Sequence, residues 1–374
     1  MTQVGLFFAA VFMTYGLRAQ TDSTLKKDQE RNFQISLITP IGTNGIESPK
    51  IVNRISINIL AGASKGVNGI EGAGFANLTM QNVIGIQGAG FVNVVLGDVT
   101  GSQFAGFTNV SMGNLKGAQF AGFCNLNKGK MRGAQFAGFS NYNHQRTEGF
   151  QGAGFINVSL GDIKGAQISG FGNIVKGNVE GFQGSGFFNY AKKVKGAQLG
   201  FINIADSVDG ASIGFLSFVK KGLHQIEVSA DELFYTNVGV RTGGYGFYNI
   251  LSAGFSPVNG TTLWHVGYGA GTSFRVNEKM RADIIATGHH VSKGLFYNGT
   301  SELYRLYFGV EYKLAKKCFI AAGPTFNLYL GDALLPDYGA KYSNIGPYTI
   351  LNETNSSGFN YKAWVGGKIA IRFL

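Results

Sequence analysis

The sequence predicts an all-β protein in which an N-terminal β-solenoid of 16-residue repeats is followed by an antiparallel β-barrel. Three observations lead to this prediction. A glycine-rich phrase returns at a fixed spacing, β-favouring residues occupy fixed places within each copy, and longer strands of alternating polarity begin near residue 223. The 374 residues include 57 Gly but also 31 Phe and 16 Tyr, too much aromatic mass for a disordered glycine-rich chain.

The repeat is clearest at residues 117–141, where the phrase GAQFAGF occurs twice, sixteen residues apart. A glycine opens each of eight copies at this spacing: Gly69, Gly85, Gly101, Gly117, Gly133, Gly149, Gly165 and Gly181. Columns of Gln, Phe and Asn keep the same period without insertions, so each copy is one structural unit stacked on the last. The predicted ladder residues of three central copies are Gln103, Phe107, Asn109, Gln119, Phe123, Asn125, Gln135, Phe139 and Asn141.

Each copy is too short for a pair of helices, and its β-branched columns favour two short strands joined by two tight turns. Glycine supplies the positive φ angles that the corners need. Parallel coils stacked about 4.8 Å apart would form a rod of about 40 Å over eight copies. Antiparallel hairpins of sixteen residues are the structural alternative.

Stacking gives the polar columns a role, because an Asn or Gln amide can bond to the same residue of the next coil. We expect the phenylalanines to stack likewise inside the rod. The alternation leaves open which strand face points inward, since Gln103 and Phe107 share one face and Phe104 the other. An outward stripe of Phe104, Phe120 and Phe136 is the less favoured use of those side chains.

The repeat carries no recurring chemistry. It lacks the regular aspartates of a calcium-binding roll, and no Gly-Lys-Ser/Thr follows its glycine clusters as in a phosphate loop. The irregular coil at 142–149 contains His144, Arg146 and Glu148, and a solvated bump is favoured there over a binding site. We therefore assign no catalytic, cofactor-binding or metal-binding residue, and no cofactor.

The chain start indicates export. Residues 5–17 are apolar and short, which predicts a signal peptide of residues 1–19 cut after Ala19. A polar lead-in (20–32), cap strands (33–68), the solenoid (69–222) and the barrel domain (223–374) follow. The net charge of +11 raises the question of nucleic acid, and export argues against that partner. The two cysteines, Cys124 and Cys318, imply no disulfide framework.

The C-terminal strands alternate between an apolar and a charged face. In the strand from Trp264, for example, Val266 and Tyr268 share one face, and His265 and Arg275 the other. A soluble sandwich would cover the apolar face, whereas an outer-membrane-type barrel turns it toward lipid, with short turns at one end and long loops at the other. The link lengths favour the barrel. The eight predicted strands are 223–231, 233–242, 245–256, 262–276, 279–291, 303–314, 317–330 and 360–374.

Repeats such as GSQFAGFTN at 101–109, followed by GFLSFVKKGLHQIEVSADELFYTN at 214–237, resemble the leptospiral-type and Bacteroidetes surface-repeat envelope proteins over about residues 33–255. The resemblance implies a cell-envelope location and carries over no site residue. With eight strands and an inner C-terminus, however, strand parity would put the rod in the periplasm.

The favoured function is a non-enzymatic envelope protein at the outer membrane or cell surface, acting as a scaffold or as an adhesion and interaction surface. Expected partners are outer-membrane lipid and envelope proteins or surface glycans. A small channel is the first alternative, although eight strands leave no aqueous lumen.

The second alternative is a hydrolase within the barrel, because His265, Ser273, Asp283 and His289 would point inward from neighbouring strands. No motif fixes their geometry, so buried hydrogen-bonded pairs are favoured. A metal site at His289 and His290 is weaker still, because adjacent residues on a strand face opposite ways.

Overall fold

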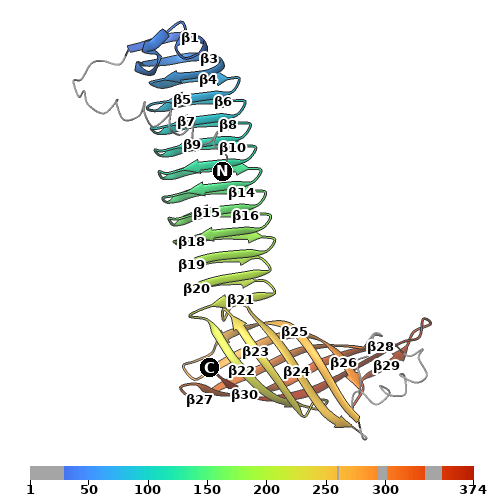
Figure 1. Cartoon of the computed structure of the whole chain (residues 1–374). Helices are drawn as coiled ribbons and strands as arrows, with labels where there is room; N and C mark the ends of the chain where they lie inside the picture. Colours follow the sequence, from blue (N-terminus) through green and yellow to red (C-terminus); the bar gives the residue numbers. More distant parts are fainter. Residues whose placement is uncertain (1–28, 259–260, 294–300, 333–347) are drawn as a thin grey trace.

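A computed structural model describes residues 29–258, 261–293, 301–332 and 348–374. It is all β, with a β-solenoid rod of about ten coils and a separate antiparallel sheet of nine strands, here called sheet B (Figure 1). The predicted signal peptide and most of the predicted lead-in lie outside the described residues. No helix in the described parts of the chain is long and apolar enough to cross a membrane.

Each coil contains a long and a short strand. In one central coil these are β8 (Val99–Ala105) and β9 (Thr108–Ser111), and in the next they are β10 (Leu115–Ala121) and β11 (Cys124–Asn127). The pairs β8–β10 and β9–β11 are parallel and in register, so equivalent residues of successive copies are neighbours. This parallel pairing excludes the hairpin alternative.

The remaining coils follow the same plan. The other long strands are β4 (Gly66–Ala73), β6 (Val83–Ala89), β12 (Met131–Ala137), β14 (Thr147–Ala153), β16 (Ile163–Ser169) and β18 (Asn178–Ser185). The other short strands are β5 (Ala76–Thr79), β7 (Val92–Val95), β13 (Ser140–Asn143), β15 (Ile156–Ser159) and β17 (Gly172–Val175). The rod ends with β19 (Phe188–Leu199), β20 (Ile202–Ile213) and β21 (Leu216–Val219).

A cap of irregular elements begins the rod. It comprises β1 (Gln29–Ile38), β2 (Ile41–Gly42), a 3-10 helix η1 (Gly45–Lys50) and β3 (Ile51–Ser64). Strand β1 pairs in parallel with β3, which pairs in parallel with β4 and β5, so the cap continues the coil stack. The prediction that 29–32 belong to a flexible lead-in is wrong, because these residues form the start of β1 against β3.

Sheet B follows the rod through β22 (Leu223–Asp231), β23 (Thr236–Gly243), β24 (Tyr248–Val258), β25 (Thr261–Arg275), β26 (Met280–Lys293), β27 (Ser301–Ala315), β28 (Cys318–Asp332), β29 (Leu351–Thr354) and β30 (Phe359–Phe373). Eight of these strands lie close to the predicted ranges, and β29 was not predicted. Neighbouring strands are antiparallel, and β22 pairs with β30 as well as with β23. Both cysteines are half-buried free thiols.

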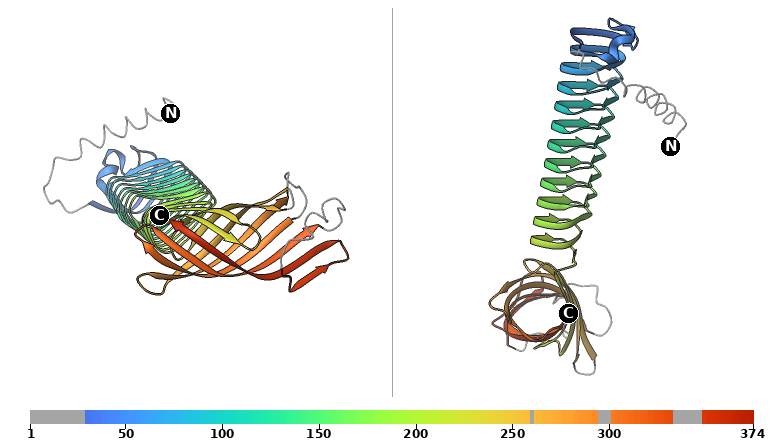
Figure 2. Two further views of the ribbon diagram at one scale, coloured as in Figure 1. Left: turned by 90° about the horizontal axis from the view of Figure 1, so that it is seen from below. Right: turned by 90° about the vertical axis from the view of Figure 1, so that its left-hand side faces the viewer.

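The rod joins sheet B on the side of the short turns (Figures 1 and 2). The Thr242 hydroxyl donates to the Ser217 carbonyl at 2.8 Å. The Tyr268 hydroxyl, on β25, donates to the carbonyl oxygens of Gly214 at 3.0 Å and Phe215 at 3.1 Å. The axis of the rod crosses the direction of the strands of sheet B, so the two parts form an L.

The corner glycines hold the coils together at close range. Gly117 has φ 137°, and a Cβ added there would lie 1.9 Å from the carbonyl oxygen of Gly101 in the coil before it. Equivalent glycines from Gly85 to Gly181 repeat this contact with φ between 127° and 138°. Glycine is therefore required at the corner by the backbone angle and by the distance between coils.

We expect Gly117→Ala to destabilise the rod by more than the 1–3 kcal/mol or so of the backbone strain alone. Gly88→Ala is the matched control, since an added Cβ there meets no atom within 4 Å and its effect should stay within about 0.5 kcal/mol. Thermal unfolding followed by circular dichroism would measure both. Equal unfolding temperatures for the two variants would contradict the corner role.

Candidate functional site

Two ladders of buried side-chain amides run through the rod, and they donate their hydrogen bonds in opposite directions along it. Gln119 Nε2 donates to Gln103 Oε1 at 2.7 Å, and Gln135 donates to Gln119 in the same direction. Asn109 Nδ2 donates the opposite way, to Asn125 Oδ1 at 2.9 Å, and Asn125 donates to Asn141. All six side chains are fully buried. Each Asn in this run also donates to a carbonyl of the neighbouring coil, Asn109 to Phe120 for instance, so few amide groups lack a partner.

The Gln ladder ends on a carboxylate. Glu71 stands at the Gln position of an early coil and accepts from Gln87 Nε2 at 2.7 Å and from the Thr79 hydroxyl at 3.2 Å. An ionised carboxylate only accepts, so this end fixes the direction in which the amides of the ladder donate. Burial raises the pKa of the Glu71 carboxyl above its usual range, while hydrogen bonds from Gln87 and its neighbours oppose the rise.

The phenylalanines of the AGF turn lie on the outside of the rod. They form a column, here called the aromatic edge, in which most neighbouring rings stack with centroids 4.7–5.9 Å apart. Each of these side chains is 37–47% exposed. The members are Phe75, Phe91, Phe107, Phe123, Phe139, Phe155, Phe171, Phe187, Phe201 and Phe215.

The expectation that these phenylalanines fill the core is therefore wrong, and Phe107, Phe123 and Phe139 stack outside it. The reason is the turn at residues 106–107, which interrupts the alternation of the strands, so that Gln103 and Asn109 face inward while Phe107 between them points outward. The interior is filled instead by the amide ladders and by a buried apolar column that includes Val99, Leu115 and Met131.

The outer face of the long strands keeps one large apolar side chain in every coil, at either of two positions. The two positions are two residues apart, and the large side chain occupies either the second or the first of them. In one coil the pair is Ala118 and Phe120, and in another it is Phe150 and Gly152. A Cβ at Gly152 would lie 3.0 Å from the Phe150 ring, so the two positions share one space. In chain order the pairs are 70 and 72, 86 and 88, 102 and 104, 118 and 120, 134 and 136, 150 and 152, 166 and 168, 182 and 184, 197 and 199, and 211 and 213.

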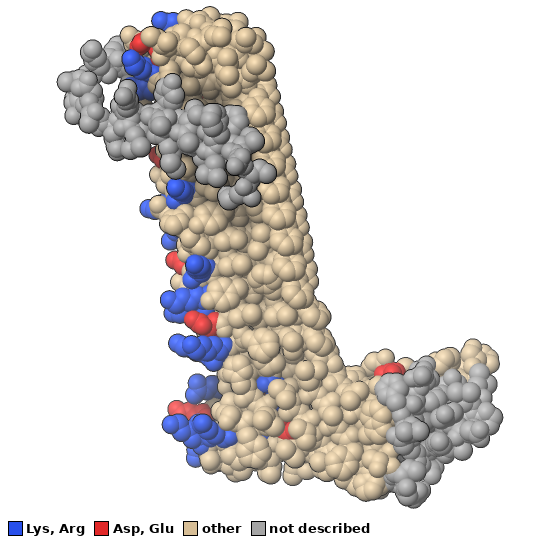
Figure 3. Space-filling view, viewed as in Figure 1, with Lys and Arg blue, Asp and Glu red and all other residues tan. Residues whose placement is uncertain are grey.

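Charged side chains of the repeats gather on the opposite edge of the rod. Apart from buried Glu71, all charged residues between Gly69 and Gly210 lie within the five residues before a corner glycine. Figure 3 shows this charged edge on the side of the rod that faces away from sheet B. Its members are Asp98, Lys116, Lys128, Lys130, Arg132, Arg146, Glu148, Asp162, Lys164, Lys176, Glu180, Lys192, Lys193, Lys195, Asp206 and Asp209.

The irregular coil at 142–149 belongs to this charged edge. His144 is exposed, and Glu148 is paired with both Arg132 and Arg146 at 3.0–3.1 Å. A hydrogen bond and charge from Arg132 hold the pKa of the Glu148 carboxyl below its usual range. Within this coil Glu148 and Arg146 pair with each other, and Arg146 also lines one end of a shallow cavity of about 420 Å³ on the charged edge, together with Lys164 and Lys195.

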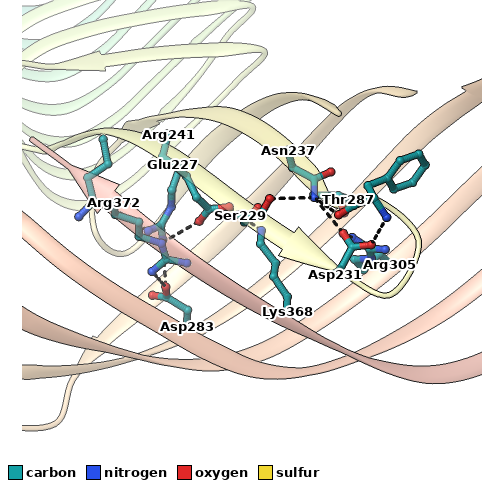
Figure 4. Close-up of polar contacts among 12 residues, drawn as sticks. Glu227, Ser229, Asp231, Asn237, Arg241, Asp283, Thr287, Arg305, Lys368 and Arg372 are labelled. Carbon is teal, nitrogen blue, oxygen red and sulfur yellow. Dashed lines mark hydrogen bonds and ion pairs between the residues drawn. The ribbon is translucent and has the colours of Figure 1, made fainter. Parts of the chain in front are cut away.

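The buried face of sheet B contains a network of three cations and three anions near the junction with the rod (Figure 4). Arg372 is at its centre and donates to Glu227 at 2.7 Å, to Glu311 at 2.8 Å and to Asp283. Arg241 also donates to Asp283, at 3.1 Å. The sixth member, Lys368, pairs with Glu227. The charges balance, as burial of ionised groups requires.

A second cluster occupies the other end of the buried face (Figure 4). Arg305 donates to Asp231 at 2.6 Å, and Asp231 also accepts the backbone N–H groups of Leu233 and Phe234. The turn between β22 and β23 thereby places Phe234 among buried apolar side chains that include Leu303 and Trp364. Both ends of this face are thus filled by side chains.

The residues of the hydrolase alternative are not assembled into a catalytic chain. His265 and His289 meet, with their Nδ1 atoms 3.0 Å apart, and His265 Nε2 bonds to Asn237 at 2.7 Å. Asp283 instead pairs with two arginines, and the Ser273 hydroxyl accepts from Arg281 at 3.0 Å. His290 bonds to Glu302 on the next strand. No group of three or more metal-ligating His, Cys, Asp or Glu side chains occurs in the ranges that the structure covers.

The exposed face of sheet B is apolar. Val238, Val266, Leu306, Phe326 and Val365 lie on five different strands and are 38–49% exposed. The alternation of polarity in the sequence indicates both faces of the sheet, but it does not identify which charges pair. Comparison of the chain with family models, curated proteins and solved structures found no match.

Because burial raises the pKa of Glu71, the folded rod holds the proton more tightly than the unfolded chain does. Its stability should therefore fall as the pH rises from the usual carboxyl range through the raised pKa, by about 1.4 kcal/mol for each unit of the rise. Glu71→Gln should abolish this loss and stabilise the rod at neutral pH. The measurement is thermal unfolding of both proteins at several pH values.

Glu148→Gln is the matched control, since the lowered pKa of Glu148 contributes stability above the usual carboxyl range that is lost as the pH falls. The wild-type stability that Glu148→Gln removes should therefore be a contribution that is lost at low pH, whereas the penalty that Glu71→Gln removes appears at high pH. A Glu71→Gln protein with the wild-type pH dependence would refute the assignment.

We expect Arg372→Met to destabilise sheet B by about 3–5 kcal/mol, because Glu227, Asp283 and Glu311 would lose a shared buried counter-charge. Arg275→Met is the control, because Arg275 lies exposed at the end of β25. Thermal unfolding followed by circular dichroism would compare the two variants. The same transition temperature in both would mean that the network contributes nothing to stability.

Proposed function

We propose that the protein is a non-enzymatic envelope protein in which sheet B forms an eight-stranded barrel in the outer membrane and carries the rod as a scaffold or interaction surface. The observation that carries this proposal is the division of sheet B into an exposed apolar face and a buried face with balanced charges. A water-soluble protein of this kind would leave a large apolar surface uncovered, whereas lipid covers it.

The pairing of the strands supports closure. Every strand from β22 to β28 has a hydrogen-bonded neighbour on both sides, and β30 pairs with both β28 and β22. Closure removes the free edges that cannot exist in hydrocarbon. Strands of 14 or 15 residues, such as β25 to β28, are long enough for a tilted crossing of a bilayer.

The turn lengths support an orientation. The links β23–β24, β25–β26 and β27–β28 are short and lie at the end of sheet B that joins the rod. At the other end, the chain between β26 and β27 and between β28 and β30 is longer, and four and two residues join β22 to β23 and β24 to β25. Bacterial barrels keep short turns in the periplasm. The rod is therefore proposed to be periplasmic, and display on the cell surface is the alternative.

The channel and hydrolase alternatives have less support. The ion network and the cluster around Phe234 fill the buried face of sheet B, which leaves little room for an aqueous path. Asp283 is held by arginines rather than by a histidine, so the elements of a catalytic triad are separated. The resemblance to the surface-repeat envelope proteins supports an envelope location, and envelope proteins or surface glycans remain the proposed partners.

Expression in a Gram-negative host tests the proposal. The protein should fractionate with outer membranes, resist extraction by carbonate and urea, and migrate differently in gels before and after heating. The rod should be cleaved by added protease in lysed but not in intact cells. Release of the whole chain in soluble form upon lysis without detergent would refute the membrane assignment, and cleavage of the rod in intact cells would refute the periplasmic orientation.

A further inference from the structure

The outside of the rod is apolar on three of its four sides. The aromatic edge forms one side, and the outer faces of the long and short strands form the two sides next to it. On the short strands the outward residues of successive coils include Val94, Val110 and Leu126. Only the charged edge, at the turn opposite the aromatic edge, is polar. The rod thus has the polarity of an amphipathic helix, drawn out over about ten coils.

The apolar character of these sides is kept even where the sequence varies. On the long strands each coil supplies one large apolar side chain and one small residue, and the pair switches places between Phe136 with Ala134 and Phe150 with Gly152. Such an exchange keeps the apolar volume of a coil while the repeat itself changes. Contact with water alone would not favour the same apolar volume on this face in every coil.

A shallow groove of about 690 Å³ follows the same face and is lined only by Gly, Ala and Phe, among them Ala105, Phe104, Phe120 and Phe136. It contains no charged or hydroxyl side chain that would fix a polar ligand. Its open shape and its lining suit an extended hydrocarbon chain more than a folded partner with a polar rim.

The aromatic edge continues directly into the apolar face of sheet B. Its last member, Phe215, stacks on Tyr268 with ring centroids 4.9 Å apart. Tyr268 lies midway along β25, on the exposed face between Val266 and Phe274, which are 49% and 54% exposed. The edge therefore meets sheet B within its apolar face and not beyond the end of the strand.

The direction of the rod completes the argument. Its axis crosses the strands of sheet B, and its charged edge faces away from the body of that sheet (Figures 1 and 3). A bilayer around sheet B would thus extend beneath the aromatic edge, at the depth of Tyr268.

We propose that the rod lies flat on the lipid surface around sheet B, with the aromatic edge inserted in the bilayer and the charged edge in water. This inference rests on the proposed membrane insertion of sheet B. It makes lipid the partner of the repeats themselves, so that the rod covers a strip of the leaflet instead of projecting from it. The unbroken row of phenylalanines then serves as one continuous membrane contact.

Site-specific fluorescence in lipid vesicles tests the inference with the full-length chain. A variant with Cys124→Ser and Cys318→Ser receives one new cysteine at Phe91, Met112 or Val266, and each is labelled with an environment-sensitive dye. Phe91 lies on the aromatic edge far from sheet B, Met112 lies on the polar side of the next coil and is 37% exposed, and Val266 reports on sheet B. Vesicles containing spin-labelled phospholipid quench any dye that touches the acyl chains.

We expect loss of fluorescence at Phe91 and at Val266 but not at Met112. Quenching at Val266 alone would overturn the inference while leaving sheet B in the membrane. No quenching at any site would instead refute the membrane insertion on which the inference rests. A Phe91 dye that is shielded from water without lipid quenching, increasingly so at higher protein-to-lipid ratios, would overturn it in favour of a second copy of the chain.

Discussion

The hydrogen bond between equivalent amides of neighbouring coils is the constraint on which the rod depends. A buried amide without a partner is costly, and Gln119 or Asn125 finds its partners only if the next coil has the same residue at the same height. This requirement keeps equivalent residues of successive coils in register, even where the spacing falls from sixteen to fifteen between Gln183 and Gln198 and to fourteen between Asn189 and Asn203. It also brings the corner glycines so close that no Cβ fits between them. The close contact of the glycines and the hydrogen bonds of the amides therefore both depend on the same in-register stacking of the coils.

Placing polar ladders inside leaves the large apolar residues for the outside, which inverts the usual distribution of a soluble repeat protein. The rod needs little apolar core, because the ladders and a narrow column of Val, Leu and Met fill its interior. Its phenylalanines are then available for an external contact. Sheet B is built on the same plan, with the ions Arg372, Asp283 and Glu311 inside and apolar side chains outside. The junction at Phe215 and Tyr268 joins the two apolar surfaces.

The charged and polar side chains that the structure describes are largely occupied by one another. The buried charges of sheet B neutralise each other, and the paired histidines 265 and 289 are separated from the serine and the aspartate that a hydrolase would need. The charged edge of the rod is solvated, and its irregular coil pairs Glu148 with two arginines. The features that vary least along the chain are its surfaces and the register of its coils, which agrees with the proposed scaffold role.

The sequence by itself determined the period, the coil as a unit, the glycine corners, the amide columns and eight of the nine strands of sheet B, because these depend on local spacing and alternation. It did not determine the inward face of the coil: Gln103 and Phe104 alternate, and either could fill a core. Only the tertiary structure decided this, because parallel stacking lets the amides bond to each other, which lowers the free-energy cost of burying them. Likewise, strand alternation indicated that Arg372 and Asp283 share a face. Their contact depends on tertiary structure, because it joins β26 and β30, which β27 and β28 separate within sheet B, on the buried side of the sheet. The place where the aromatic edge meets β25 was also a matter of packing, beyond the reach of any repeat pattern.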